Sequence, residues 1–276
     1  LRTRGAVIVE PEEGPLASGR SGQGRLADEA RILSALQATL HPRRDWSGRR
    51  LLISAGPTQE AIDPVRFISN RSSGKMGYAL AEAAQARGAE VLLVSGPTAL
   101  TPPAGVELCP VTTAEEMRKA VISRFSWSDT VIMAAAVADF RPTQPAAQKL
   151  KKRRSPVTSL ELSPTDDILR ELGERRTTQV LVGFAAETED LLAHAREKLQ
   201  AKGVDLLVAN DVTAAGSGFG SDTNRVFILD RDGRAEELPL LPKREVADRI
   251  LDRVLTLPTG RRSTKPAAGT GTHRKE

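Results

Sequence analysis

The stretch KMGYALAEAAQARGAEVLLVSG, residues 75–96, decides the fold because it passes from a helical pattern to a strand pattern within a few residues. The apolar residues of its first part lie on one stripe of a helix, namely Met76, Ala79, Leu80, Ala83 and Ala84. Gly88 is placed to end that helix, and EVLLVSG, 90–96, is a short apolar run typical of a buried strand. RLLISAG, 50–56, has the same strand pattern upstream. Strand, helix and strand in this order predict one unit of a parallel sheet.

The rest of the chain extends this alternation. Thr113 and Glu116 form a capping-box pattern ahead of a helix, and Gly203 is placed to end a charged helix over 188–203. Residues 225–241 predict a hairpin around Asp232-Gly233, and 243–255 predict a last helix. Further strands are expected at TVIMAAA (130–136), VLVGF (180–184) and DLLVA (205–209). The expected fold class is α/β: a doubly wound, Rossmann-like, mostly parallel sheet with a late β-hairpin.

Composition indicates an ordinary globular protein with an N-terminal extension. The 276 residues are 39% hydrophobic and 27% charged. Residues 1–45 are expected to be an extension or linker with one short amphipathic helix at 26–40, residues 46–258 the main domain, and 259–276 a disordered basic tail. One cysteine, Cys109, excludes an internal disulfide framework and fits a reducing cytoplasm. The chain has no apolar run long enough to span a membrane and no signal-peptide pattern, and it begins without methionine as a fragment would.

The basic charge could indicate a nucleic-acid partner. The net charge is +5 and the pI is near 9.6. Much of the excess lies in the tail, 260–276, and in KLKKRR, 149–154, and neither run carries the interleaved aromatic residues on which single strands stack. We therefore favour a solvated tail and a basic loop, and expect no nucleic-acid partner and no membrane contact.

The turn FISNRSSGKMG, 67–77, has the composition of an anion site. Ser72, Ser73 and Gly74 directly precede the expected helix, where backbone N–H groups and the helix dipole favour a negative ligand. Met76 stands where a Walker A motif would have Ser or Thr. A dinucleotide fold would turn within about six residues through G-x-G-x-x-G, whereas this chain inserts residues 57–73 before the helix, so nicotinamide binding is weakly supported.

Other loops after predicted strands carry polar groups. Asp139 follows the strand at 130–136 and suits a ribose hydroxyl or a metal ion, although it could merely cap a turn. Lys198 and Lys202 lie four residues apart on one helix face, where they hold an anionic ligand or form a solvated basic face. NDVTAAGSGFGSDTN, 210–224, is consistent with a lid or a subunit contact. No serine or cysteine triad and no Cys/His metal cluster is apparent, and the three histidines are His41, His194 and His273.

Six blocks of the sequence, in this order, resemble phosphopantothenate–cysteine ligases. They are AGPTQEAIDPVRFISNRSSGKMGYALAEAA, AAAVADFRP, KLKK, VGFAAET, KGVDLLVANDV and GFGSDTN. They are most similar to the synthetase half of the bacterial bifunctional coenzyme A biosynthesis flavoprotein, over about residues 46–256. Residues 5–26 resemble the end of its decarboxylase half, so the resemblance implies that FMN and decarboxylation belong to a parent protein.

The resemblance implies a two-step reaction with CTP as co-substrate and Mg²⁺ as cofactor. The carboxylate of 4′-phosphopantothenate attacks the α-phosphate of CTP, which gives an acyl-cytidylate and pyrophosphate. The amine of L-cysteine then attacks the activated carbonyl, which releases CMP and forms 4′-phosphopantothenoylcysteine. The resemblance also implies a homodimer of this domain with a site shared between two subunits, in the cytoplasm.

The same resemblance implies roles for individual residues. Asn70 and Lys149 are the expected catalytic residues, Lys149 as a mobile cation that neutralises phosphate. The expected CTP-binding residues are Met133, Ala134, Ala135, Asp139, Lys149, Asp167, Ile168, Phe184, Lys198 and Lys202. Phosphopantothenate or the intermediate is expected to contact Asn70, Arg66, Ser72, Ser73 and Gly74, and Asp139 is a candidate metal ligand. The family has a short Pro-Asp-Ile turn where this chain reads SPTDDIL, so the positions of Asp167 and Ile168 can shift by one residue.

Two other classes stay open at the level of sequence. A nicotinamide-dependent reductase would need the absent glycine fingerprint, and a nucleic-acid module would bind with a steep salt dependence and without preference for cytosine. The sequence also leaves ATP or UTP open as an alternative nucleotide.

Overall fold

The computed structural model describes residues 6–15, 19, 21–40, 43–151, 159–187, 191–211, 216, 218 and 220–257. Its strands are β1 (Glu12–Pro15), β2 (Ser21–Arg25), β3 (Arg50–Ala55), β4 (Gln59–Ala61), β5 (Phe67–Ser69), β6 (Glu90–Ser95), β7 (Glu107–Pro110), β8 (Thr130–Met133), β9 (Phe140–Pro142), β10 (Leu162–Pro164), β11 (Val180–Glu187), β12 (Leu206–Asp211), β13 (Thr223–Asp230) and β14 (Ala235–Pro242). Its helices are α1 (Glu29–Leu40), α2 (Lys75–Ala86), α3 (Ala114–Arg124), α4 (Ile168–Arg175), α5 (Leu191–Lys202) and α6 (Lys243–Leu255), with a 3-10 turn η2 (Phe125–Trp127).

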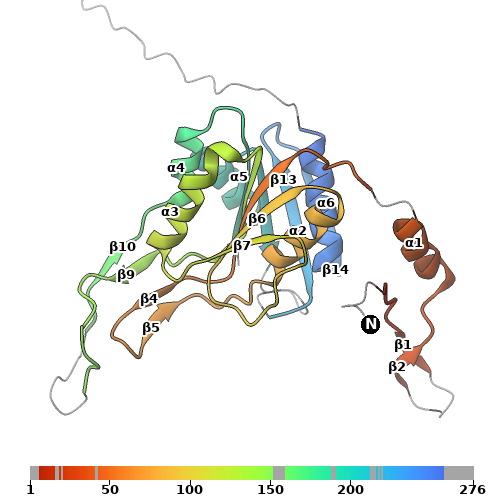
Figure 1. The fold of residues 1–276 in the computed structure, drawn as a ribbon, viewed down its shortest axis with the longest axis horizontal. Coiled ribbons are helices and arrows are strands. Elements are labelled where there is room, and N and C mark those ends of the chain that lie inside the picture. The colour runs from red at the N-terminus through yellow and green to blue at the C-terminus, as the bar shows by residue number, and fades with distance from the viewer. Residues whose placement is uncertain are drawn as a thin grey trace, which may run out of the picture.

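An eight-stranded sheet forms the centre of the molecule, in the order β14-β13-β12-β11-β8-β3-β6-β7 (Figure 1). The strands from β12 to β7 pair in parallel, whereas β13 and β14 pair antiparallel at one edge. The expected doubly wound, mostly parallel sheet with a late hairpin is thus confirmed. The chain adds β6 and β7 on one side of β3 and then β8, β11 and β12 on the other, so the strand order reverses between β3 and β8. This is the switch point beside which such sheets bind ligands.

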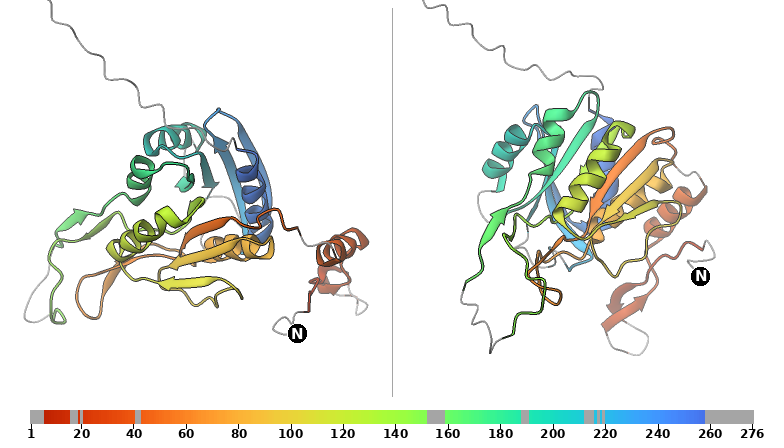
Figure 2. Two further views of the ribbon diagram at one scale, coloured as in Figure 1. Left: turned by 45° about the horizontal axis from the view of Figure 1, so that its top comes forward. Right: turned by 60° about the vertical axis from the view of Figure 1, so that its left-hand side comes forward.

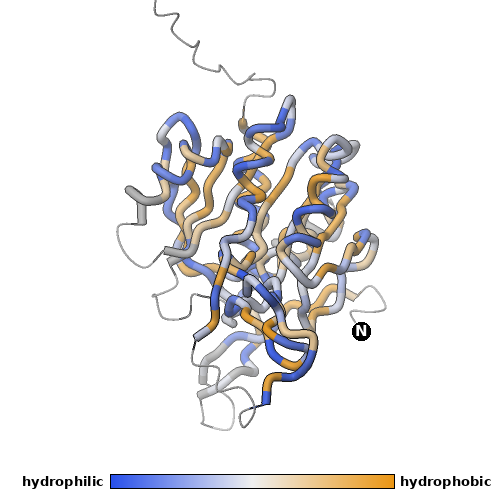
Figure 3. The backbone as a smooth tube through the Cα atoms, turned by 90° about the vertical axis from the view of Figure 1, so that its left-hand side faces the viewer, coloured by the Kyte–Doolittle hydropathy of each residue, from blue (hydrophilic) through white to orange (hydrophobic). Residues whose placement is uncertain are grey.

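Helices cover both faces of the sheet (Figures 1 and 2). Leu51 and Ile53 of β3 pack in a buried cluster with α2 and α6, whereas Leu52 packs in a second cluster with α3, α4 and α5. Successive residues of a strand point to opposite faces, so a continuous apolar run is needed to serve both layers. Figure 3 shows the hydrophobic residues gathered along the central strands.

Local sequence signals fix the ends of several elements. Thr113 Oγ1 accepts from Glu116 N at 3.1 Å and Glu116 Oε2 accepts from Thr113 N at 3.2 Å, so the capping box is confirmed. In the β13–β14 turn, Gly233 N donates to Asp230 O at 3.1 Å. Gly77 lets α2 lie close against β3, because a Cβ there would come within 2.5 Å of Ala55 Cβ.

Two small hairpins, which sequence patterns did not predict, project from the sheet at the lower left of Figure 1. β4 pairs with β5, and β9 pairs with β10. Residues 143–151 join them to each other, since Ala146 N donates to Ile62 O at 2.9 Å. We call the two hairpins and 143–151 the projecting arm. The basic residues Lys152, Arg153 and Arg154 lie outside the described residues.

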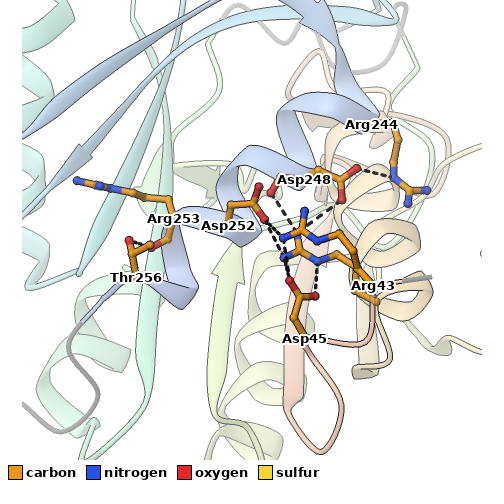
Figure 4. A network of polar contacts seen from close by, with 8 residues as sticks. Arg43, Asp45, Arg244, Asp248, Asp252, Arg253 and Thr256 are labelled. Carbon is orange, nitrogen blue, oxygen red and sulfur yellow. Dashed lines mark hydrogen bonds and ion pairs between the residues drawn. The ribbon is translucent and has the colours of Figure 1, made fainter. Parts of the chain in front are cut away.

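The N-terminal segment contains the expected helix, α1, and a two-stranded sheet of β1 and β2 that was not expected. Where this segment enters the domain, Asp45 pairs with Arg87 at the end of α2, and Arg43 pairs with Asp252 of α6 (Figure 4). In the part of the chain that the structure covers, none of the helices combines the length and apolar character needed to cross a bilayer. The predicted basic tail, His41, His273 and the side chain of His194 fall outside what is described.

Candidate functional site

A cavity of about 910 Å³ opens at the carboxyl ends of the parallel strands, at the switch point. Its walls come from β8, β10, β11, β12 and β13, from the loops before α2 and after β8, and from α2, α4, α5 and α6. The polar or charged lining residues are Asn70, Arg71, Ser72, Ser73, Lys75, Asp139, Thr165, Asp166, Asp167, Lys198, Lys202, Asn210, Asn224 and Lys243. Met133, Ala134, Ala135, Ile168 and Phe184 supply apolar surface. A cavity of this size, with apolar walls and a few polar groups, is typical of a small-molecule site.

The turn before α2 forms one wall and fits a negative ligand. Gly74 is the N-cap of α2 with φ 78°, a left-handed conformation, and no side chain caps the helix. A Cβ on Gly74 would meet Thr98 Cγ2 at 2.7 Å, so both the backbone and the packing require glycine. The amides of the first turn of α2 therefore face the cavity without a capping side chain, which is the arrangement that binds phosphate.

Asn70 connects this turn to the loop after β8. Its Nδ2 donates to Val137 O at 2.9 Å and to Ala136 O at 3.3 Å. The loop after β8 is also attached to β3, because Ala135 N donates to the buried Ser54 Oγ at 3.1 Å. The two loops are thus fixed relative to each other, and backbone groups of 133–137 lie at the cavity wall.

The lysines of α5, Lys198 and Lys202, supply positive charge to the same cavity. Lys202 Nζ contacts Asp167 Oδ2, and Asp167 Oδ1 caps α4 by accepting from Arg170 N at 3.1 Å. Lys198 lies one turn earlier on the same helix and also lines the cavity. The N-cap role of Asp167 gives a physical reason for its position: the carboxylate satisfies α4 and at the same time holds one lysine at the cavity edge.

Thirteen of the fifteen residues predicted for the site line this cavity, and two do not. Arg66 and Lys149 lie on the projecting arm. Arg66 Nη2 donates to Leu150 O at 2.5 Å and pairs with the buried Asp63 at 3.1 Å, and Asp63 Oδ2 also accepts from Leu150 N at 3.1 Å. Two side chains, Arg66 and Asp63, therefore fix the backbone next to Lys149, whose side chain is exposed.

Sequence reasoning missed three lining residues that the fold brings in from the C-terminal part. Asn210 lies one residue before the end of β12, Asn224 is the second residue of β13 and Lys243 is the first residue of α6. Asn224 is buried, and its Nδ2 lies 3.6 Å from Met76 Sδ. Burial, together with the nearby charge of Lys75, lowers the pKa of Lys243 from 10.5 to about 8, while Asp222 opposes the shift. No motif marks Lys243, because its proximity to α2 arises from the way the antiparallel hairpin returns the chain.

Among the residues described, no group of three or more His, Cys, Asp or Glu side chains could hold a metal ion. The carboxylates at the cavity are Asp139, Asp166 and Asp167. Asp167 is engaged with Lys202 and α4, and Asp166 pairs with Arg118 at 3.7 Å. Asp139 is exposed at the end of the loop after β8. A single available carboxylate fits Mg²⁺ in the form in which it accompanies a nucleotide, since most of its ligands are then phosphate and water oxygens.

Comparison with known proteins identifies the family. Residues 46–257 match the family described as the DNA/pantothenate metabolism flavoprotein C-terminal domain. The coenzyme A biosynthesis bifunctional protein CoaBC of Bacillus subtilis is 51% identical over 266 residues, which cover 94% of this chain and 65% of that protein. The chain thus spans just under two thirds of that relative's length.

Solved structures agree with this assignment. The crystal structure of the C-terminal domain of a CoaBC protein has a TM-score of 0.66 and 47% identity, and the match covers 76% of this chain and 96% of that one. A Cab2 mutant in complex with phosphopantothenate-cysteine has a TM-score of 0.62 over 80% of this chain and 88% of that one, and at 21% identity it shows a common fold. The chain belongs to the DNA/pantothenate metabolism flavoprotein C-terminal domain family.

Proposed function

We propose that this chain is a phosphopantothenate–cysteine ligase that uses CTP and forms 4′-phosphopantothenoylcysteine for coenzyme A biosynthesis. The observation that carries the proposal is the cavity of about 910 Å³, in which a helix N-terminus, the loop after β8 and the lysines of α5 face one another. These three walls come from separate blocks of the sequence, and each suits one part of the substrates. The names of the relatives support the same pathway.

The charges of the cavity support the activation step. The carboxylate of 4′-phosphopantothenate must approach the α-phosphorus of CTP, although both are anions. Lys198 and Lys202 supply cations on one side and the first turn of α2 supplies backbone N–H groups on the other. A new O–P bond then forms, the bond from the α-phosphorus to the bridging oxygen breaks, and pyrophosphate leaves.

The amide-forming step requires that the acyl carbonyl be held for attack. The cysteine nitrogen bonds to the carbonyl carbon, loses a proton, and CMP leaves with the C–O bond pair. We assign the holding role to Asn70, because its side chain already fixes the two loops between which the intermediate would lie. Positioning supplies most of the acceleration here, since CMP is a good leaving group.

The cytosine base and the metal ion complete the proposal. Backbone groups at 133–135 and the Phe184 ring would contact the base, and this is the basis for proposing CTP over ATP. Asp139 would hold Mg²⁺ together with triphosphate oxygens, and the ion would neutralise phosphate charge during activation.

We also propose a cytoplasmic homodimer in which the projecting arm completes the site of a second subunit. The arm exposes Val65, Phe67, Phe140 and Leu162, each at least 44% accessible, which is unusual for one small region of a monomer. Arg66 and Lys149 lie on the same arm and outside the cavity of their own chain, so a second chain is where they would reach phosphate.

A pyrophosphate-release assay with each of the four nucleotides, with and without 4′-phosphopantothenate, tests the proposal. We expect release that requires both CTP and 4′-phosphopantothenate, followed by amide product when cysteine is added. If ATP is the best nucleotide, the assignment of residues 133–135 and Phe184 to cytosine recognition is refuted. If no nucleotide gives product, the ligase function is refuted. Light scattering that finds a fully active monomer would refute the dimer.

One observation favours a second candidate. The parallel strands have the order of a dinucleotide-binding sheet, with β3 and β8 at the switch point. A nicotinamide-dependent reductase would therefore bind NADPH in the same cavity. Tight NADPH binding that CTP does not compete away would favour the reductase over the ligase.

A further inference from the structure

Two lysines from different helices converge on one segment of chain at the cavity. Lys75 is the first residue of α2 and Lys243 is the first residue of α6, and both line the cavity. The segment between them consists of Gly218 and residues 220–223, immediately before β13.

Lys243 is bound almost entirely to backbone. Its side chain is 6% exposed, and Nζ donates to Gly218 O at 3.0 Å, to Ser221 O, and to Thr223 O at 3.5 Å. Its own backbone N donates to Asp222 O at 2.9 Å. One residue thus fixes the segment at four carbonyl groups.

Lys75 meets the same segment from the other side. Its Nζ donates to Asp222 Oδ1 at 2.6 Å and to Gly220 O at 3.0 Å. The bond from Lys75 lowers the pKa of Asp222, so this carboxylate is ionised at neutral pH. The direction of the Lys75 side chain therefore depends on where the segment lies.

We propose that Lys243 is a positioning residue: it fixes Gly218 and residues 220–223 and so places Asp222, which in turn holds the Lys75 ammonium at the cavity wall. Lys75 is then the group that meets an anionic substrate, and Lys243 acts through it. The catalytic consequence rests on the proposed ligase function, whereas the structural link between the two lysines does not.

Proton linkage gives the segment a measurable signature. The charged groups that face Lys243 are Lys75 and Asp222, and burial together with Lys75 lowers its pKa to about 8. Opening the segment would return Lys243 to water, where its pKa is near 10.5. The closed segment therefore binds fewer protons than the open one, and raising the pH from 7 to 9 should favour closure roughly tenfold.

A double-mutant cycle in the full chain tests the link between the lysines. We expect Lys243→Met to lower kcat/KM for amide formation at least about tenfold when Lys75 is present, and less than about threefold in a Lys75→Met background. Losses that multiply in the double variant would overturn the proposal, because they would mean that Lys243 does not act through Lys75. Arg244→Met is the matched control, since Arg244 is the next residue of α6 and pairs on the surface with Asp248 and Glu82.

Hydrogen exchange tests the same link without turnover. In the wild-type chain, protection of the amides of 220–224, corrected for the intrinsic rate, should rise between pH 7 and 9, as it should in Arg244→Met. Protection that is independent of pH in the wild type would overturn the proposal even if Lys243→Met fails to fold. If the wild type shows no turnover but its protection rises as expected, the ligase fails and the positioning role stands.

Discussion

Two buried cations show how differently this chain uses positive charge. Arg87, 3% exposed, donates to both oxygens of Asp45 at 2.9 and 2.7 Å and pairs with Asp252 at 2.8 Å, at the junction of the N-terminal segment with α2 and α6. Lys243, 6% exposed, is surrounded by backbone carbonyls, and its closest charged neighbours include another lysine.

The chemistry of the two side chains explains the difference. A guanidinium is always charged and binds carboxylates in a rigid fork, so Arg87 makes a permanent structural joint. An ammonium changes its pKa readily when it is buried, so the charge of Lys243 is sensitive to pH and to anions. The cation that is balanced by carboxylates holds the fold together, and the one that is not lies at the cavity.

Arg87→Met should give the largest effect on stability. It leaves the carboxylates of Asp45, Asp248 and Asp252 facing one another, and since these are about one third accessible to water we expect a loss of about 2–4 kcal/mol in the free energy of unfolding. Turnover of the folded fraction should stay within about twofold of wild type. Urea unfolding and activity measured together check this. A loss of activity without a loss of stability would contradict the structural role assigned to Arg87.

Asn70→Asp should give the largest effect on the reaction. The new carboxylate would face Ala136 O and Val137 O, which now accept from the Asn70 amide, and would repel the acyl-cytidylate. We expect amide formation to fall at least about a hundredfold while pyrophosphate exchange continues and the intermediate accumulates. Rapid-quench analysis with labelled CTP checks this. If no intermediate forms, Asn70 is needed for the activation step, and its assignment to the amide-forming step is wrong. Ser69→Ala is the control, because Ser69 lies outside the cavity.

The pH dependence of stability should separate the two buried cations. The folded-state pKa of Lys243 is lowered, so the unfolded chain binds more protons between about pH 8 and 10.5, and stability rises with pH there. Between pH 7 and pH 9 the free energy of unfolding of the wild type should rise by about 1 kcal/mol more than that of Lys243→Met. Urea unfolding at the two pH values checks this, and Arg87→Met should retain the gain because it leaves the contacts of Lys243 in place.

Arg43→Met should give the smallest effect. Arg43 pairs with Asp45 at 2.8 Å and Asp252 at 2.7 Å, but its side chain is 56% exposed, so water compensates for most of the loss. We expect less than about 1 kcal/mol in the free energy of unfolding. A loss equal to that of Arg87→Met would mean that burial does not decide which arginine matters.

Much of the cavity could be predicted from sequence because its residues lie on or after the parallel strands, whose carboxyl ends meet at one edge. Asp139 lies in the loop after β8, Phe184 lies in the C-terminal half of β11, and the serines before Gly74 end the connection from β3 to α2. The projecting arm could not be predicted, because β4, β5, β9 and β10 are three residues long each and carry no usable periodicity. The resemblance assigned Arg66 and Lys149 to a site shared between two subunits, but no local pattern showed that both lie outside the cavity of their own chain.

The sequence by itself determined the alternation of elements, the doubly wound sheet and the family, because these depend on local periodicity, caps and contiguous motifs. Thr113 with Glu116, and Asp232 with Gly233, are signals that are read within a few residues. Only the tertiary structure decided that Lys243 meets Gly218 and Lys75, and that Arg87 meets Asp45. The residues of such pairs lie tens or hundreds of positions apart in the sequence and meet only because helices and hairpins pack together. No local sequence pattern indicates which residues will meet.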